Sequence, residues 1–212
     1  MRREIMSNQT GVRKAKETNA PRVIVGITGA SGAVYGLTAL KALRAAGVET
    51  HLVVSRSGQI TMAHETETKF SDLSALADVV YRIDDIAAAI SSGSFQTMGM
   101  IIAPCSVRSL AEIASGVTSS LLTRAADVVL KERRRLILMV RETPFHLGHL
   151  RSMTQVTEMG AIVMPPIPAF YARPATLDDM VNHSVGRALD LLGINNDLVR
   201  RWGETVGIGD GR

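Results

Sequence analysis

The sequence predicts an α/β protein with a doubly wound parallel sheet, Rossmann-like or flavodoxin-like, in a three-layer α/β/α arrangement. From Arg22 onward, short apolar runs rich in β-branched residues alternate with longer segments of helical periodicity. Alternation of this kind is typical of a parallel sheet covered on both faces. No internal repeat and no linker rich in Pro, Gly or Ser divides the chain. We therefore expect a single domain over residues 22–204, a basic disordered tail at 1–21 and a C-terminal tail at 205–212.

The expected elements follow from these patterns in chain order. Strands are predicted at residues 22–28, 49–55, 79–83, 99–104, 135–141 and 161–164. Helices are predicted near residues 33–46, 57–64, 106–115, 121–132, 146–159 and 176–192. The last helix begins with the sequence Thr-Leu-Asp-Asp at 176–179, which is typical of a capping box.

A glycine-rich turn, GITGASGAVYG, connects the first predicted strand to the first helix. Glycine permits tight turns and close approach of a ligand, and the helix N-terminus that follows attracts anions. Gly29, Ala30 and Ser31, followed by Gly32, are therefore expected to hold a phosphate. The glycine spacing departs from the dinucleotide pattern G-x-G-x-x-G, and the second strand ends at Ser55 instead of an acid. NAD fits poorly, while NADP, FMN or a simple phosphate stays open.

The charge of the chain is concentrated at its beginning. There are 24 Lys and Arg against 20 Asp and Glu, a net charge of +4. Residues 1–22 contribute all of this excess, so nucleic-acid binding is not expected as the main function. No apolar stretch approaches the roughly 18 residues of a membrane span, and no secretory signal is evident. The single cysteine, Cys105, fits a reducing compartment, so we expect a cytoplasmic protein.

Polar residues follow five of the predicted strands. Since the carboxyl ends of parallel strands meet at one edge of the sheet, these residues are expected to form one pocket. They are residues 29–31, 55–57, 104–109, 141–144 and 165–171, and they include serines, arginines, a glutamate and a tyrosine. This composition indicates an anion-binding pocket that is capable of acid–base chemistry.

Several candidate residues allow two interpretations. Arg141 and Glu142 either form a structural ion pair or serve proton transfer. The cations at 133–135 are expected to complement a helix C-terminus, whereas Lys131, beside apolar neighbours, is a stronger candidate for a site. Trp202 resembles a docking anchor more than a site residue.

Cys105, His146 and His149 are candidates for reactive groups or metal ligands. No histidine has an evident position to pair with Cys105, which is therefore expected to be buried filler. His146 and His149 have a spacing that could hold a metal, but surface or capping roles are expected, and no metal site is predicted.

Seven segments of the chain resemble the UbiX family of flavin prenyltransferases. They are GITGASGAVYG (26–36), AHETE (63–67), SSGSFQTMGMIIAPCS (91–106), LLTRAADVVLKERRRL (121–136), VRETPFHLGHL (140–150), MPPIPAFYARP (164–174) and RWGE (201–204). The resemblance extends from about Arg22 to Glu204. The chain is similar to family members that act in ubiquinone biosynthesis and in aromatic acid decarboxylation. Arg56 and Arg108 stand where lysine is frequent in the family.

The resemblance implies a transferase that acts on reduced FMN and dimethylallyl monophosphate. The dimethylallyl group becomes attached to flavin N5 and C6, and the prenylated FMN product serves a UbiD-type decarboxylase. The resemblance also implies a homododecamer with each site at a junction of subunits.

Roles for individual residues are likewise implied by the resemblance. The residues expected to hold FMN and its phosphate are Gly29, Ala30, Ser31, Ser55, Ser106, Val107, Arg108, Ser109 and Arg141. Those expected to bind dimethylallyl phosphate are Lys131, Arg141, Tyr171, Arg187 and Trp202, with Trp202 reaching from a neighbouring subunit. The catalytic set is Glu142 for proton transfer, Ser31 near flavin N5, Lys131, and Glu65 in support.

The residues agree with metal-independent chemistry on a monophosphate. The chain lacks the D-D-x-x-D pattern of Mg²⁺-dependent prenyl diphosphate enzymes, so lysine, arginine and tyrosine would stabilise the leaving phosphate. Two alternatives stay open: a flavin-dependent decarboxylase of the cysteine-decarboxylase type, and a non-catalytic flavin carrier. The decarboxylase group needs a histidine near the first helix, and residues 33–40 contain none.

Overall fold

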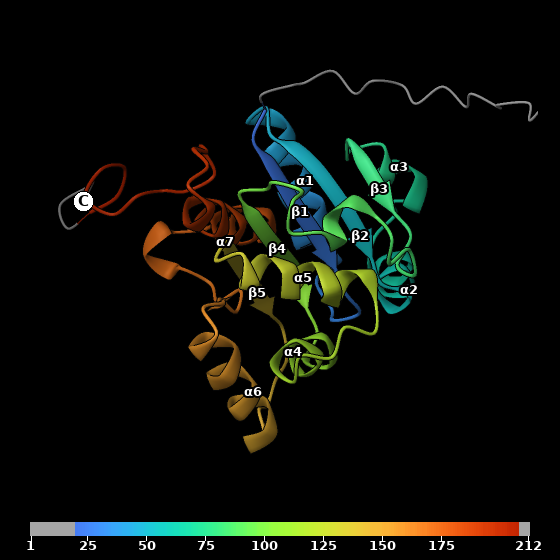
Figure 1. Ribbon diagram of the computed structural model, residues 1–212. Coiled ribbons are helices and arrows are strands. Elements are labelled where there is room, and N and C mark those ends of the chain that lie inside the picture. Colours follow the sequence, from blue (N-terminus) through green and yellow to red (C-terminus); the bar gives the residue numbers. More distant parts are fainter. Residues whose placement is uncertain (1–19, 208–212) are drawn as a thin grey trace, which may run out of the picture.

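The computed structural model describes residues 20–207 and contains one sheet of six parallel strands (Figure 1). The strands are β1 (Arg22–Ile27), β2 (Glu49–Val54), β3 (Val79–Tyr81), β4 (Gly99–Cys105), β5 (Arg135–Val140) and β6 (Ile162–Val163). Their order is β3-β2-β1-β4-β5-β6, and every neighbouring pair is parallel. The predicted doubly wound sheet is confirmed, in the Rossmann strand order. Residues 1–19 of the predicted basic tail and residues 208–212 lie outside the described residues.

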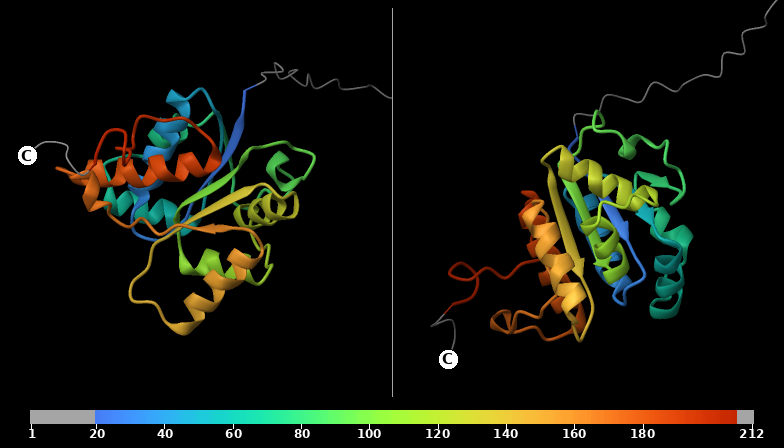
Figure 2. Two further views of the ribbon diagram at one scale, coloured as in Figure 1. Left: turned by 90° about the vertical axis from the view of Figure 1, so that its left-hand side faces the viewer. Right: turned by 60° about the horizontal axis from the view of Figure 1, so that its bottom comes forward.

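Helices cover both faces of the sheet (Figure 2). They are α1 (Ala33–Ala45), α2 (Arg56–Glu65), α3 (Phe70–Ser74), α4 (Val107–Ala114), α5 (Leu121–Lys131), α6 (Leu147–Glu158) and α7 (Leu177–Leu192). Apolar residues of α1 and α7 form the core on one face, and those of α4, α5 and α6 form the core on the other. The predicted three-layer arrangement is thereby confirmed.

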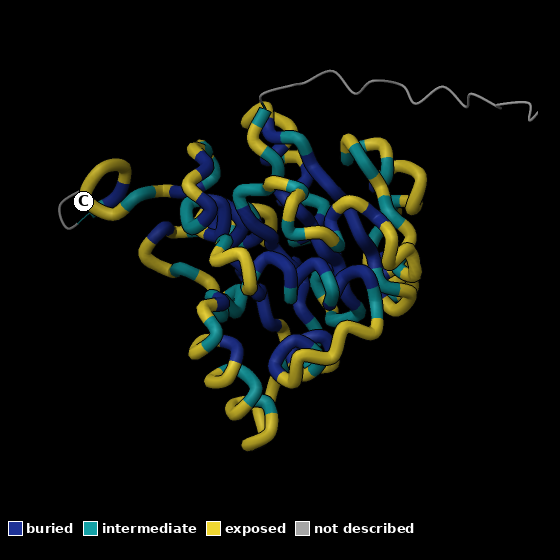
Figure 3. Tube along the Cα trace, viewed as in Figure 1, coloured by how far each residue is buried: buried dark blue, intermediate teal, exposed yellow. Residues whose placement is uncertain are grey.

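Alternation along the strands explains how one sheet contributes to two cores. In β1, Val23, Val25 and Ile27 belong to the cluster with α1 and α7, whereas Ile24 faces the opposite cluster. Both faces of β1 are therefore apolar, as expected for a parallel sheet buried between helices. β1, β2, β4 and β5 are buried along most of their length, whereas α6 is largely exposed (Figure 3).

The strand order reverses between β1 and β4, and this is where ligands of doubly wound folds bind. Thr28 ties the two strand ends together. Its hydroxyl donates to the carbonyl oxygen of Pro104 at 2.7 Å and accepts from the N–H of Ser106 at 2.7 Å. The glycine-rich turn after β1 is thus fixed beside the start of α4.

The predicted capping box of α7 is present. The Thr176 side chain accepts from the Asp179 N–H at 3.1 Å, and the Asp179 carboxylate accepts from the Thr176 N–H at 2.9 Å. Three short elements were not predicted: α3 and the 3-10 turns η1 (Ala89–Ser91) and η2 (Phe170–Ala172). Among residues 20–207, no helix is both long and apolar enough to cross a membrane.

Candidate active site

The N-terminus of α1 holds a carboxylate of the chain itself. Glu65, the last residue of α2, accepts hydrogen bonds from the Gly32 N–H at 2.8 Å and the Ala33 N–H at 3.0 Å. Gly32 has φ 108°, a conformation that glycine adopts without penalty and that turns the chain into the helix. The predicted anion position at this helix N-terminus is therefore real, but Glu65 occupies these two donors instead of a phosphate. The expectation of a phosphate on Gly32 is corrected accordingly.

Glu65 is the centre of a charged cluster with Ser31 and Arg141. Burial raises the pKa of the Glu65 carboxyl, but hydrogen bonds from the Ser31 hydroxyl and the two N–H groups, together with the Arg141 guanidinium, bring it below its usual value. Arg141 also acts on Tyr35, whose pKa is raised by burial and lowered in part by this guanidinium. Ser31, Glu65 and Arg141, predicted from three separate segments, thus lie together at the carboxyl edge of the sheet.

Glu65→Gln is expected to lower the free energy of unfolding by roughly 0.5–1 kcal/mol at neutral pH, because the amide loses the charge that complements the α1 dipole. The lowered folded-state pKa determines the pH dependence. The contribution of Glu65 is present above its ordinary pKa and is lost as the pH falls through the lowered value. The difference between variant and wild type in urea unfolding should therefore shrink as the pH falls below the ordinary pKa of a glutamate, and it should be lost once the pH has passed the lowered value. The control is the exposed neighbour Glu67→Gln, and equal losses in both variants would contradict the capping role.

A cleft of about 540 Å³ lies between the N-termini of α2 and α4. Ser55 is the N-cap of α2 and accepts from the Gly58 N–H at 3.0 Å, while Ser106 is the N-cap of α4 and accepts from the Ser109 N–H at 3.3 Å. We call this the serine cleft; it is lined by Ser55, Arg56, Ser57, Ile60, Ile83, Asp84, Ser106, Arg108, Ser109, Glu112, Ser119, Ser120 and Leu122. Two helix N-termini with serine hydroxyls and two arginines make it suitable for a phosphate.

The glycine-rich turn borders the start of α2. A side chain at Gly29 would lie 2.5 Å from the Ser57 side chain, so only glycine fits this position without a shift. The Thr61 hydroxyl donates to the Gly29 carbonyl at 3.2 Å. Gly29 and Ala30 therefore lie between the serine cleft and the Glu65 cluster. Val107 and Arg108 form the first turn of α4, and Arg108 pairs with Glu112 at 3.0 Å.

Glu142 follows Arg141 immediately after β5, at the same edge of the sheet as Ser31. Its carboxylate accepts from the Thr143 N–H at 2.9 Å, and the residue is half-buried. The structural ion pair between Arg141 and Glu142 that the sequence allowed is absent among the described residues. Glu142 is therefore a carboxylate without a cationic partner in residues 20–207.

Three of the predicted prenyl-phosphate residues form a second group beside α7. The Tyr171 ring meets the Trp202 ring edge to face at 5.6 Å, and Arg187 pairs with Asp190 at 3.0 Å. Asp190 also accepts two hydrogen bonds at 2.9 Å from Arg201, the neighbour of Trp202. Within residues 20–207, no hydrogen bond or ion pair joins this group to Ser31, Glu65 or Arg141.

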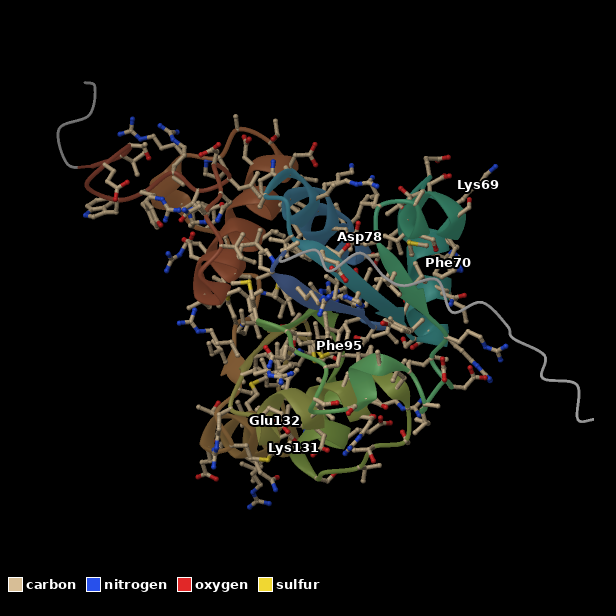
Figure 4. All side chains as sticks on the ribbon, turned by 45° about the horizontal axis from the view of Figure 1, so that its top comes forward. Lys69, Phe70, Asp78, Phe95, Lys131 and Glu132 are labelled. Atoms are coloured by element: carbon tan, nitrogen blue, oxygen red, sulfur yellow. The ribbon has the colours of Figure 1, made fainter. Side chains whose placement is uncertain are left out.

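Lys131 lies at the opposite edge of the sheet. It is the last residue of α5, which leads into the beginning of β5, and its ammonium pairs with the Glu132 carboxylate (Figure 4). Glu142 follows the other end of β5, and a strand of six residues spans about 20 Å. Lys131 therefore does not reach Glu142 of its own chain.

The remaining candidates are structural. Cys105 is fully buried, and burial raises the pKa of its thiol to about 12, which confirms the prediction of buried filler. His146 is the N-cap of α6 and accepts from the Gly148 N–H at 3.0 Å, as the capping interpretation predicted. His149 stacks on it with ring centroids 3.6 Å apart.

Two contacts near the site were not predicted from the sequence. Glu65 contacts the N-terminus of α1, which lies more than 30 residues earlier in the sequence, and no local pattern predicts this contact. His183, whose ring nitrogen lies 3.3 Å from the Tyr171 hydroxyl, looks in the sequence like any polar residue in a helix. His183 and Arg187 are four residues apart and therefore lie on one face of α7, and this spacing is the signal that could have indicated His183 as a neighbour of the site.

Known proteins are similar to this chain in sequence and fold. The Flavoprotein family model matches residues 12–189. The flavin prenyltransferase UbiX of Thauera aromatica is 56% identical over 181 residues, which cover 85% of this chain and 93% of the relative.

Two solved structures are similar to the whole described fold. A UbiX crystal structure in complex with FMN and dimethylallyl pyrophosphate is 48% identical, with a TM-score of 0.86 over 87% of this chain and 98% of that chain. A dodecameric FMN-dependent UbiX-like decarboxylase from Escherichia coli O157:H7 is 49% identical, with a TM-score of 0.83 over 85% of this chain and 98% of that chain. Together with the fold, the serine cleft and the Glu65 cluster, these similarities establish that the chain belongs to the UbiX family of flavin prenyltransferases.

Proposed function

We propose that the protein joins the dimethylallyl group of dimethylallyl monophosphate to N5 and C6 of reduced FMN. The observation that carries this proposal is the serine cleft beside the Ser31–Glu65–Arg141 cluster at the reversal point of the sheet. A phosphate-binding cleft next to a carboxylate and an arginine matches a substrate with a phosphate at one end and an isoalloxazine ring at the other. The catalytic domain comprises residues 22–204.

The serine cleft fits the phosphate of FMN. The first-turn N–H groups of α2 and α4 have no partner within their own helices, and both helix dipoles direct positive charge into the cleft. Ser55, Ser106 and Ser109, with the main chain at Val107 and Arg108, supply the remaining donors. When bound, reduced FMN supplies the nucleophilic ring positions that receive the prenyl group.

The residues at the carboxyl edge of the sheet orient hydrogen bonds and accept a proton beside the flavin ring. The Ser31 hydroxyl is held by Glu65, which fixes its direction, and Gly29 and Ala30 let the ring approach the main chain. Glu142 is the carboxylate that accepts the proton released from N5, because it follows β5 at the same edge and lacks a cationic partner within residues 20–207. Hydrogen bonds from Ser31 and the main chain favour the ionised form of Glu65, and the positive charge of Arg141 adds to this effect and acts toward the substrate.

The prenyl-phosphate site is completed by more than one copy of the chain. Tyr171, Arg187 and Trp202 form one group, whereas Lys131 and Glu142 lie at opposite ends of β5, a strand that spans about 20 Å, which supports a site built from more than one copy. The dodecameric relative supports a homododecamer in which Lys131 and Trp202 act on a neighbouring copy's flavin. The cations and the tyrosine then stabilise the departing phosphate, while the indole face shelters the positive charge on the allylic carbon.

The decisive experiment is anaerobic incubation with reduced FMN and dimethylallyl monophosphate, without added metal, followed by mass spectrometry of the flavin. A mass gain of one dimethylallyl unit is the expected result. Unmodified flavin that stays bound would contradict the proposal and favour the carrier or the cysteine-decarboxylase type, which a screen of carboxylic acids would separate. We further propose that the product passes to a UbiD-type decarboxylase and that the protein acts in the cytoplasm.

A further inference from the structure

A buried histidine contacts the hydroxyl of Tyr171. The Tyr171 Oη and the His183 Nε2 are 3.3 Å apart, and the two rings meet edge to face with centroids 5.6 Å apart. Tyr171 lies on η2 and is 43% exposed, whereas His183 lies in the middle of α7 and is 9% exposed. The buried His183 imidazole therefore contacts a Tyr171 phenol that is partly exposed to solvent.

The surroundings of His183 hold the other members of the same group. Arg187 lies one turn further along α7, on the same face as His183. The Asp190 carboxylate forms an ion pair with the Arg187 guanidinium, with nitrogen and oxygen 3.0 Å apart, and it accepts two hydrogen bonds from Arg201. Because Arg201 precedes Trp202, whose ring packs on Tyr171, the phenol is held between α7 and the C-terminal segment.

The charge state of His183 suits a positioning role. Burial and the Arg187 guanidinium lower the pKa of the imidazole, and these effects outweigh the opposing contributions of the Arg200 main chain and Asp190. A neutral imidazole offers one hydrogen-bond acceptor and one donor. It therefore orients the Tyr171 hydroxyl without adding a charge to the site.

We propose that His183 is a positioning residue, whose hydrogen bond holds the Tyr171 hydroxyl ready for the phosphate of the prenyl substrate. This inference rests on the proposed function, because it gives Tyr171 a phosphate to bind. A phenol held in place loses less conformational freedom when the substrate arrives, so affinity rises without a new contact. His183 touches Tyr171 and acts through it.

The test is a double-mutant cycle on FMN-loaded protein, with the flavin oxidised so that no turnover occurs. Calorimetry measures the affinity for dimethylallyl monophosphate in wild type, His183→Phe, Tyr171→Phe and the double variant. A hydrogen bond contributes about 0.5–1.5 kcal/mol, so His183→Phe should weaken binding by about threefold to tenfold. In the Tyr171→Phe background the same change should have no further effect.

Two further measurements keep the result interpretable. His183→Gln retains a hydrogen-bonding group and should restore most of the affinity, and FMN affinity should be unchanged in every variant, which reports correct folding. Equal weakening by His183→Phe in both backgrounds, or none in either, would overturn the inference. Failure of the proposed function looks different, because wild-type protein would then neither bind dimethylallyl monophosphate nor prenylate reduced FMN.

Discussion

Glu142→Gln is expected to lower the rate of flavin prenylation by about two to four orders of magnitude while FMN affinity stays unchanged. The amide keeps the shape of the carboxylate and still accepts a hydrogen bond from the Thr143 N–H, so the turn after β5 is preserved. It does not accept a proton at neutral pH, and the step that requires a base is lost. Single-turnover mass spectrometry with reduced FMN measures the rate, and flavin fluorescence measures the affinity.

Glu142→Asp is the matched control for this prediction. It keeps the carboxylate but withdraws it by one methylene, so an intermediate rate is expected if proton transfer is the role. A Glu142→Gln variant with wild-type turnover would remove Glu142 from the mechanism. In that case Glu65, whose pKa is lowered by hydrogen bonds from Ser31 and the main chain, would be the next carboxylate to test.

Mixing two inactive variants is expected to restore activity. Lys131→Ala and Glu142→Gln each damage every site when present alone. If a site takes Lys131 from one copy and Glu142 from another, random co-assembly leaves about a quarter of the sites intact. Co-expression of the two variants should therefore recover about a quarter of wild-type turnover, in the same prenylation assay.

A second mixture controls for this result. Ser31 and Glu142 both follow strands of one chain at the carboxyl edge of its sheet, so Ser31→Ala mixed with Glu142→Gln should stay inactive. Recovery in the first mixture and not in the second identifies the shared site. If neither mixture recovers activity, Lys131 does not act across the interface, and full activity of Lys131→Ala alone would exclude it from the site.

The main elements were predictable from the sequence because their signals are local. Apolar runs and helical periodicity located the six strands and the six longer helices to within a few residues. The short α3 and the turns η1 and η2 were not, because three to five residues are too few to show a period. The Rossmann order also needed the structure, since both doubly wound orders alternate in the same way along the chain.

The carboxyl-edge part of the site was predictable for a related reason. Parallel strands place their carboxyl ends together, so Ser31, Ser55, Ser106 and Arg141 could be assigned to one edge from strand positions alone. The position of Glu65 could not, because its contact with the N-terminus of α1 depends on how α2 packs beside that helix.

Residue chemistry and periodicity are properties of short segments, and they were enough to assign the α/β fold and to name the candidate site residues. Proximity between distant segments is a property of the whole fold. The packing of α2 beside α1 brings Glu65 to the Gly32 and Ala33 N–H groups, while the packing of η2 on α7 brings Tyr171 to His183. Only the tertiary structure decided these two contacts, because each joins segments that no local pattern relates.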